Sequence, residues 1–149
     1  MADTEIKNPS PKDDCETLLD AVLPAAQHFL GKYGEFYPFG ATLSLTHEVA
    51  LVAAEIGEEH PTPSAVMALI ENGFRSGAQR HMYRATALVH HVSAVPPEKT
   101  TEQNCIAVSL NHQSGYSILV VFPYTQTTQN KVVLEAPFAY ETDNTIFGE

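Results

Sequence analysis

Ten consecutive residues, 32–41, constrain the fold of this chain more than any other segment. They read Lys-Tyr-Gly-Glu-Phe-Tyr-Pro-Phe-Gly-Ala. Two of the chain's seven phenylalanines and two of its six tyrosines lie in this segment. Gly34 suits the end of a helix, Pro38 restricts the backbone path, and Gly40 permits a bend where a strand begins. We call residues 32–41 the aromatic segment. It predicts a stiff helix-to-strand connection whose aromatic rings either pack in the core or bind a ligand or partner.

The residues before the aromatic segment predict a helix. Residues 1–13 are polar, and we expect them to form a disordered N-terminal segment ahead of one domain, 14–149. Asp13 and Glu16 have the spacing of a capping box, and apolar residues then recur at helical spacing up to residue 33. Pro24 interrupts this pattern, which predicts a kink or a break in the helix.

From Tyr37 onward the apolar residues alternate, which is typical of strands. Residues 39–45 and 49–54 predict a hairpin, and Thr62-Pro63 marks the start of a second helix. Gly73 and Gly77 lie four residues apart in that helix, and we expect both to approach a sheet closely. Further strands are predicted at residues 84–95, 105–112, 116–122 and 131–136. The tail, 137–149, contains four apolar or aromatic residues that favour packing on the body of the domain.

This order of elements predicts an α+β fold. We expect two layers, with an antiparallel sheet of five to six strands and both helices on one face, in the order α-β-β-α-β-β-β-β. The order is similar to that of profilin-like and roadblock-like domains. A cystatin-like sheet wrapped on one long helix is the alternative.

Composition restricts the classes of partner. The chain has 149 residues, of which 44% are hydrophobic, so a substantial core is expected. Its 18 acidic and 8 basic residues give a net charge of −10, which disfavours nucleic acid and anionic membranes and permits a basic protein partner. Neither a signal peptide nor a membrane-spanning run is recognisable, which predicts a cytoplasmic protein. In that reducing compartment Cys15 and Cys105 are expected to be buried thiols.

The ionisable and nucleophilic residues show no catalytic pattern. His90 and His91 are adjacent in a predicted strand, so they point to opposite faces and cannot hold one metal ion together. His112 is expected in a solvated hairpin turn, and Ser114 lacks the surroundings of a nucleophile elbow. We therefore expect no cofactor, no metal and no catalytic residue. The candidate residues for binding a ligand or partner are Glu35, Phe36, Tyr37, His90 and His91.

Three segments carry a resemblance to a known group of proteins. They are Phe29-Leu30-x-Lys32 through Ala41, Asn111-His112-x-x-Gly115-Tyr116-Ser117, and Phe122-Pro123-Tyr124. Together they resemble a family of small bacterial proteins of unknown function, over most of the chain after Asp14. The family supplies no catalytic residues. The turn Thr46-His47-Glu48 departs from its pattern, because it lacks the glycine expected in this turn.

The sequence predicts a non-enzymatic domain that binds protein and forms a homodimer. Strands 84–95 and 116–122 carry apolar residues at both odd and even positions, so both faces of these strands are apolar. We therefore expect two copies to meet through an uncovered sheet face or a strand edge. One alternative is an immunity or antitoxin-type protein that binds a basic toxin. Another is a small-molecule or hydrolytic pocket lined by the aromatic segment. In that segment we expect Phe39 in the core and Phe36 or Tyr37 partly exposed.

Overall fold

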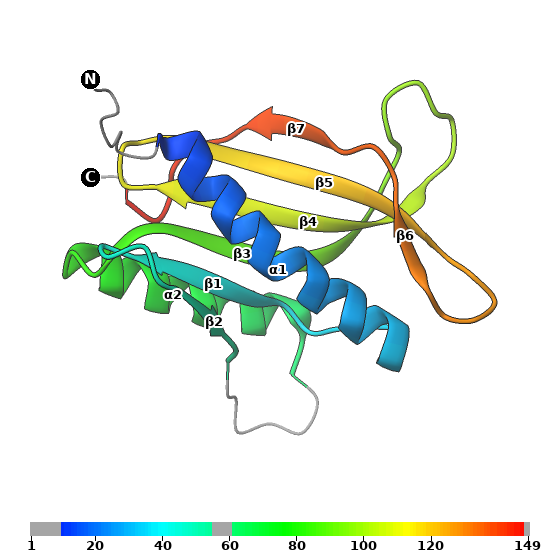
Figure 1. Cartoon of the computed structure of the whole chain (residues 1–149), viewed down its shortest axis with the longest axis horizontal. Helices are drawn as coiled ribbons and strands as arrows, with labels where there is room; N and C mark the ends of the chain where they lie inside the picture. Colours follow the sequence, from blue (N-terminus) through cyan, green and yellow to red (C-terminus); the bar gives the residue numbers. More distant parts are fainter. Residues whose placement is uncertain (1–9, 55–60, 148–149) are drawn as a thin grey trace, which may run out of the picture.

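The computed structural model describes residues 10–54 and 61–147, which form two helices and seven strands (Figure 1). The elements are α1 (Pro11–Tyr33), β1 (Phe39–Ser44), β2 (Val49–Val52), α2 (Pro63–Gln79), β3 (Tyr83–Ala94), β4 (Gln103–His112), β5 (Ser117–Gln126), β6 (Val132–Leu134) and β7 (Phe138–Glu141). The predicted α+β class, the antiparallel sheet and the order of the first eight elements are confirmed. The seventh strand, β7, lies in the segment expected to be a tail.

The sheet is antiparallel throughout, with strand order β2-β1-β3-β4-β5-β6. The long strands β3 and β4 pair from Ala85 opposite His112 to Ala94 opposite Gln103. Strand β5 has two neighbours on its other side: β7 pairs with its first half and β6 with its second half. At the opposite side of the sheet β2 is an edge strand, paired with β1 alone.

The two helices lie on opposite faces of the sheet, so the expectation of both helices on one face is wrong. Helix α1 packs on odd-numbered residues of β1 and β3, such as Ala41 and Val89, whereas α2 packs on Leu88, which points to the other face. Successive strand residues point to opposite faces, so a strand with apolar residues at both odd and even positions needs a cover on each side. The domain therefore has three layers, with α1 in front of the sheet and α2 behind it in Figure 1.

The N-cap of helix α1 lies three residues before the predicted cap, Asp13. Ser10 is the N-cap, and its hydroxyl and the carboxylate of Asp13 each accept a hydrogen bond from the other residue's backbone N–H at 3.1 Å. Pro11 occupies the first turn, where a proline loses no helical hydrogen bond. The expected disorder is therefore wrong for residues 11–13, and residues 1–9 lie outside the described residues.

Helix α1 continues through Pro24, so the expected break does not occur. Proline removes the hydrogen bond that the carbonyl of Asp20 would accept. Both Pro24 and Asp20 are exposed, so water can bond that carbonyl instead. The opposite face of the helix is buried, with Leu18, Val22 and further residues at helical spacing in contact with the sheet.

Helix α2 begins as predicted, with Thr62 as N-cap and Pro63 in the first turn. Gly77 is buried, and a β-carbon added there would overlap the ring of Tyr83, so its predicted close contact is confirmed. Gly73 is exposed, and a β-carbon there would meet no atom within 4 Å. The expected contact at Gly73 is therefore wrong, because this side of the helix turns away from the sheet.

The C-terminal tail packs on the domain as expected. Beyond β7, the amide of Asn144 donates hydrogen bonds to the carbonyls of His112 and Tyr116 at 2.9 and 3.2 Å. Ile146 is 6% exposed and packs with α2 and Leu88. Among the described residues, neither helix has the length and apolar character needed to cross a membrane.

Candidate functional site

A groove lies between the C-terminal end of α1, the aromatic segment and the end of β2. Its volume is about 600 Å³. It is lined by Phe29, Tyr33, Glu35, Phe36, Tyr37, Pro38, Phe39, Leu51, Val52, Ala53, Ala54 and Pro63. Six of these residues belong to the aromatic segment, and we call this feature the aromatic groove. The structure thus brings the aromatic segment together with the edge strand β2, through the predicted hairpin of β1 and β2, and with Phe29 of α1, which no sequence pattern connects to it.

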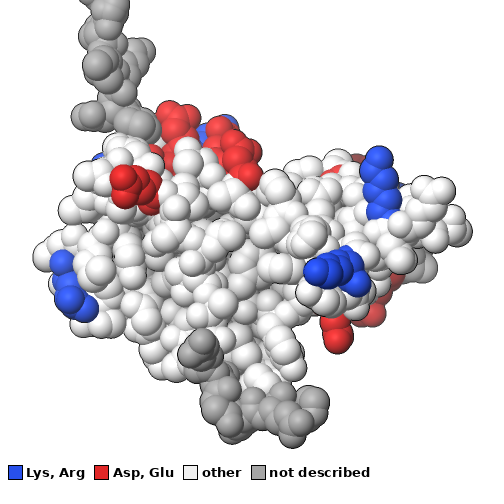
Figure 2. Space-filling view, turned by 60° about the horizontal axis from the view of Figure 1, so that its bottom comes forward, with Lys and Arg blue, Asp and Glu red and all other residues white. Residues whose placement is uncertain are grey.

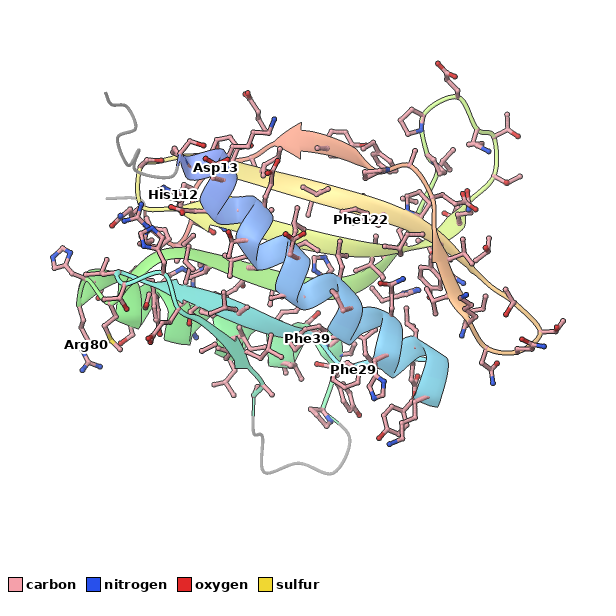
Figure 3. The ribbon with its side chains drawn as sticks, viewed as in Figure 1. Asp13, Phe29, Phe39, Arg80, His112 and Phe122 are labelled. Atoms are coloured by element: carbon pink, nitrogen blue, oxygen red, sulfur yellow. The ribbon has the colours of Figure 1, made fainter. Side chains whose placement is uncertain are left out.

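Three phenylalanine rings form the inner wall of the aromatic groove. Phe39 is 6% exposed, and its ring centroid lies 5.5 Å from that of Phe29 and 5.7 Å from that of Phe36. Both ring pairs are edge-to-face, which is a favoured arrangement for aromatic side chains. Figure 3 shows Phe29 and Phe39 together near the C-terminal half of α1. The prediction that Phe39 belongs to the core is confirmed.

Two tyrosines form the outer rim of the groove. Tyr33 is 64% exposed and Tyr37 is 54% exposed, while Phe36 is half-buried. The prediction that Phe36 or Tyr37 would be partly exposed at the rim of a groove is confirmed for both. The strand-like alternation expected from Tyr37 onward does not hold in this segment, because Tyr37 is exposed whereas Phe39, two residues later, is buried and contacts Phe36; strand β1 begins only at Phe39.

Glycine geometry explains why the aromatic segment takes this path. Gly34 has a φ of 77° and ends α1 by donating its N–H to the carbonyl of Leu30 at 2.9 Å. A β-carbon at Gly40 would lie 2.5 Å from the carbonyl oxygen of Ala87 and 2.7 Å from the ring of Phe74. At Gly34 a glycine avoids the strain of the left-handed backbone, and at Gly40 it avoids a clash between a side chain and these two neighbours. The two glycines therefore hold the rings between them at the groove.

The described residues give the aromatic groove little charge. Among the lining residues within 10–54 and 61–147, Glu35 is the one carboxylate, and no lysine, arginine or histidine takes part. Glu35 is exposed. The ammonium of Lys32 lies outside the lining, 5.3 Å from the ring centroid of Tyr33. The groove can therefore hold an apolar body, with a single acid group beside it.

The structure does not bring His90 and His91 to the groove. They point to opposite faces of the sheet, as predicted: the ring of His91 contacts Tyr124 on the α1 side, 6.2 Å between centroids. His91 is exposed, whereas the Nδ1 atom of His90 is buried without a hydrogen-bond partner. Burial, together with the charge of His91, lowers the pKa of His90. Neither histidine lines the groove.

A buried polar cluster at the other end of α1 was not predicted. Asp14 is 1% exposed, and its Oδ2 atom lies 2.7 Å from Nε2 of His112 and 3.1 Å from Nε of Arg84. His47, with a φ of 69°, places its Nε2 atom 3.8 Å from Oδ1 of Asp14. His112 is 4% exposed, so its expected place in a solvated turn is wrong. In Figure 3 His112 lies beside the N-terminal turn of α1, far from Phe29 and Phe39.

The hydrogen bonds define the state of the His112 ring. The backbone N–H of Ser114 donates to Nδ1 at 3.0 Å, so Nδ1 is an acceptor and the ring proton on Nε2 is donated to Asp14. The hydroxyl of Ser114 lies 2.9 Å from the same Nδ1. Hydroxyl, imidazole and carboxylate are the groups of a catalytic triad, but Arg84 also binds this carboxylate. A second cavity, of about 410 Å³, is lined by Gln113 but not by Ser114, so the Ser114 hydroxyl does not form part of the wall of that cavity.

We interpret this cluster as a structural clamp, because it joins α1, β3 and the β4–β5 turn. One signal in the sequence points to it: Asp14 stands four residues before the buried Leu18, on the apolar face of α1. The neighbouring thiol also responds to this environment. Burial, with the charges of Asp14 and Glu16, raises the pKa of Cys15 to about 12, so this thiol is protonated and unreactive at neutral pH.

Within residues 10–54 and 61–147, no three His, Cys, Asp or Glu side chains are arranged to hold a metal ion. Comparison with known proteins identified no matching family model, no matching curated protein and no matching solved structure. The resemblance to small bacterial proteins through the aromatic segment stays a prediction. The likeness to profilin-like and roadblock-like domains is one of element order.

Proposed function

We propose that this protein binds a small apolar molecule in the aromatic groove. The observation that carries the proposal is the groove itself: about 600 Å³, lined almost entirely by aromatic and aliphatic side chains. Ligand sites in proteins have volumes of roughly 300–1,000 Å³ and a similar apolar lining with few polar groups. The aromatic groove has both properties.

The rings that would contact the ligand are already held in place. Phe39 is fixed by its edge-to-face contacts with Phe29 and Phe36, so binding requires little ordering of the inner wall. At the rim, Tyr33 and Tyr37 expose large rings that a ligand would remove from water. This exposed aromatic surface next to a preformed hollow supports a binding role.

The lining favours binding over hydrolysis, the other activity considered for a pocket at this segment. Within the part of the chain that the structure describes, no serine, threonine, cysteine or histidine contributes to the groove. Hydrolysis through a serine, threonine or cysteine nucleophile, or with a histidine as general base, needs one of these groups near the substrate. We therefore propose a non-enzymatic role for the groove.

A fluorescence titration with the neutral apolar probe N-phenyl-1-naphthylamine tests the proposal. We expect saturable enhancement of its emission and about a tenfold weaker affinity in Tyr37→Ala, because the variant loses a rim ring. Tyr140→Ala is the matched control: Tyr140 is 55% exposed, close to the 54% of Tyr37, and lies on β7 outside the groove. Absence of saturable binding, or equal effects of both variants, would contradict the proposal.

A second role, self-association through the edge strand β2, is favoured by a separate observation. Val49 and Leu51 are 38% and 58% exposed on a strand whose outer backbone groups face no other strand of the described sheet. Unpaired edges of this kind pair readily with another chain. Figure 2 brings forward the lower side of Figure 1, where β2 lies, and shows that the described side chains at the centre of this view are largely uncharged.

Light scattering at micromolar concentration tests this second role. We expect a mass of twice 16.3 kDa for the unmodified chain and 16.3 kDa for Leu51→Lys, because a charge on the edge opposes pairing. Val133→Lys is the control, since Val133 is similarly exposed at 44% but lies on β6. A monomeric unmodified chain at this concentration would count against the dimer.

A further inference from the structure

We infer that the ligand of the aromatic groove is an organic cation, an amine joined to an apolar body. The inference rests on the proposed function and adds the ligand's charge. Its basis is the position of Glu35, the one carboxylate that the described part of the chain contributes to the lining, between the rim rings of Tyr33 and Tyr37 in the chain. None of the described residues that line the groove has a cationic side chain to oppose a bound amine.

The end of α1 contributes to the same preference. The groove includes Phe29 and Tyr33 from the last turns of the helix, and α1 ends at Tyr33. The C-terminal end of a helix carries a partial negative charge from its unpaired carbonyl groups. Glu35 lies two residues beyond this end. The carboxylate and the helix terminus therefore favour the same sign of charge in a ligand.

The rim rings provide a third contribution. The faces of tyrosine rings are electron-rich and attract cations. One such contact is already present, because the ammonium of Lys32 lies 5.3 Å from the ring centroid of Tyr33. Tyr37 has no such neighbour among the cation–ring contacts of the described residues, and its ring is 54% exposed. A ligand amine would lie between the ring of Tyr37 and the carboxylate of Glu35.

The positive charge of Lys32 should slightly weaken the binding of an amine. Its ammonium lies near the rim but outside the lining, so it would repel a ligand amine weakly. Removing that charge while keeping a similar stem, in Lys32→Met, should raise the affinity for an amine about twofold. The same change should not raise the affinity for a neutral ligand.

Competition against the neutral probe N-phenyl-1-naphthylamine tests the inference with three compounds of one shape: 4-phenylbutylamine, 4-phenylbutanol and 4-phenylbutyrate. We expect the amine to bind about tenfold more tightly than the alcohol, and the carboxylate to bind most weakly. Glu35→Gln should reduce the amine-to-alcohol affinity ratio to about two, because it removes the charge and keeps the size of the side chain. Glu141→Gln, an exposed acid on β7, should leave the ratio at about ten.

The outcomes separate the two proposals. Equal displacement by amine and alcohol would overturn the charge preference and leave apolar binding intact. An amine preference that persists in Glu35→Gln would overturn the assignment of Glu35 as the group that recognises the amine. If the probe does not bind the unmodified chain, the proposed function itself is wrong.

Discussion

The Nε2 atom of His112 donates a hydrogen bond of 2.7 Å to Oδ2 of Asp14, although 98 residues separate the two in sequence. The same oxygen accepts a hydrogen bond from Arg84 at 3.1 Å. Through this one carboxylate the first turn of α1 is joined to β3 and to the end of β4. Because all three side chains are at most partly exposed, the bonds form in surroundings that strengthen them.

Asp14→Asn should destabilise the domain by about 3 kcal/mol. The amide retains the size of the carboxylate but leaves the Arg84 guanidinium without its buried counter-charge. Urea unfolding followed by circular dichroism measures the free energy of unfolding. Asp20→Asn is the control, because Asp20 is exposed on the same helix. If both variants unfold at the same urea concentration, the clamp contributes no stability.

Gly77→Ala and Gly73→Ala should change stability in opposite directions. A β-carbon at Gly77 overlaps the ring of Tyr83, so we expect a loss of about 1 to 3 kcal/mol in spite of the better helix propensity of alanine. At Gly73 the space is open, so alanine should stabilise the helix by about 1 kcal/mol. Thermal unfolding of the two variants checks both signs. A Gly77→Ala variant that melts no lower than the unmodified chain would show that Tyr83 moves aside freely.

Phe39→Ala and Tyr37→Ala should separate stability from binding. Phe39 is 6% exposed, and its removal should cost about 3 to 5 kcal/mol of the free energy of unfolding. Tyr37 is 54% exposed, so its truncation should cost less than about 1 kcal/mol and act mainly on ligand affinity. Chemical denaturation gives both values. A large loss in Tyr37→Ala would identify this ring as part of the core.

His90 should make stability depend on pH in the acid range. Burial lowers its pKa in the folded chain, so below the unfolded value of 6.5 the unfolded chain binds a proton that the folded chain does not. This contribution to stability is present above 6.5 and is lost as the pH falls through the folded pKa. His90→Leu should therefore flatten the dependence of the free energy of unfolding on pH below 6.5.

The control for this measurement is His28→Leu, since His28 is exposed on α1. Denaturant unfolding at a series of pH values between 4 and 7 gives the slope for each variant. We expect the slope to decrease in His90→Leu and not in His28→Leu. Equal slopes in the unmodified chain and in His90→Leu would show that other groups cause the acid dependence.

The sequence alone determined the features that depend on neighbouring residues. Helical spacing, the Thr62-Pro63 start and strand alternation located both helices and the first six strands to within a few residues, except for the start of α1 and the end of β5. The aromatic segment likewise indicated a ring in the core and rings at a rim, which the exposures of Phe39 and Tyr37 confirm. These patterns are set by backbone geometry over a few residues.

The tertiary structure was needed to show which helix covers which face of the sheet and which distant residues are in contact. Because Leu88 and Val89 make both faces of β3 apolar, the sequence could not assign a face to each helix. Nor could it place Phe29 of α1 against Phe39 in the wall of the groove, or His112 beside Asp14. Such contacts join residues far apart in the chain, and they depend on strand order and on which apolar faces cover one another. Local periodicity carries no information about either.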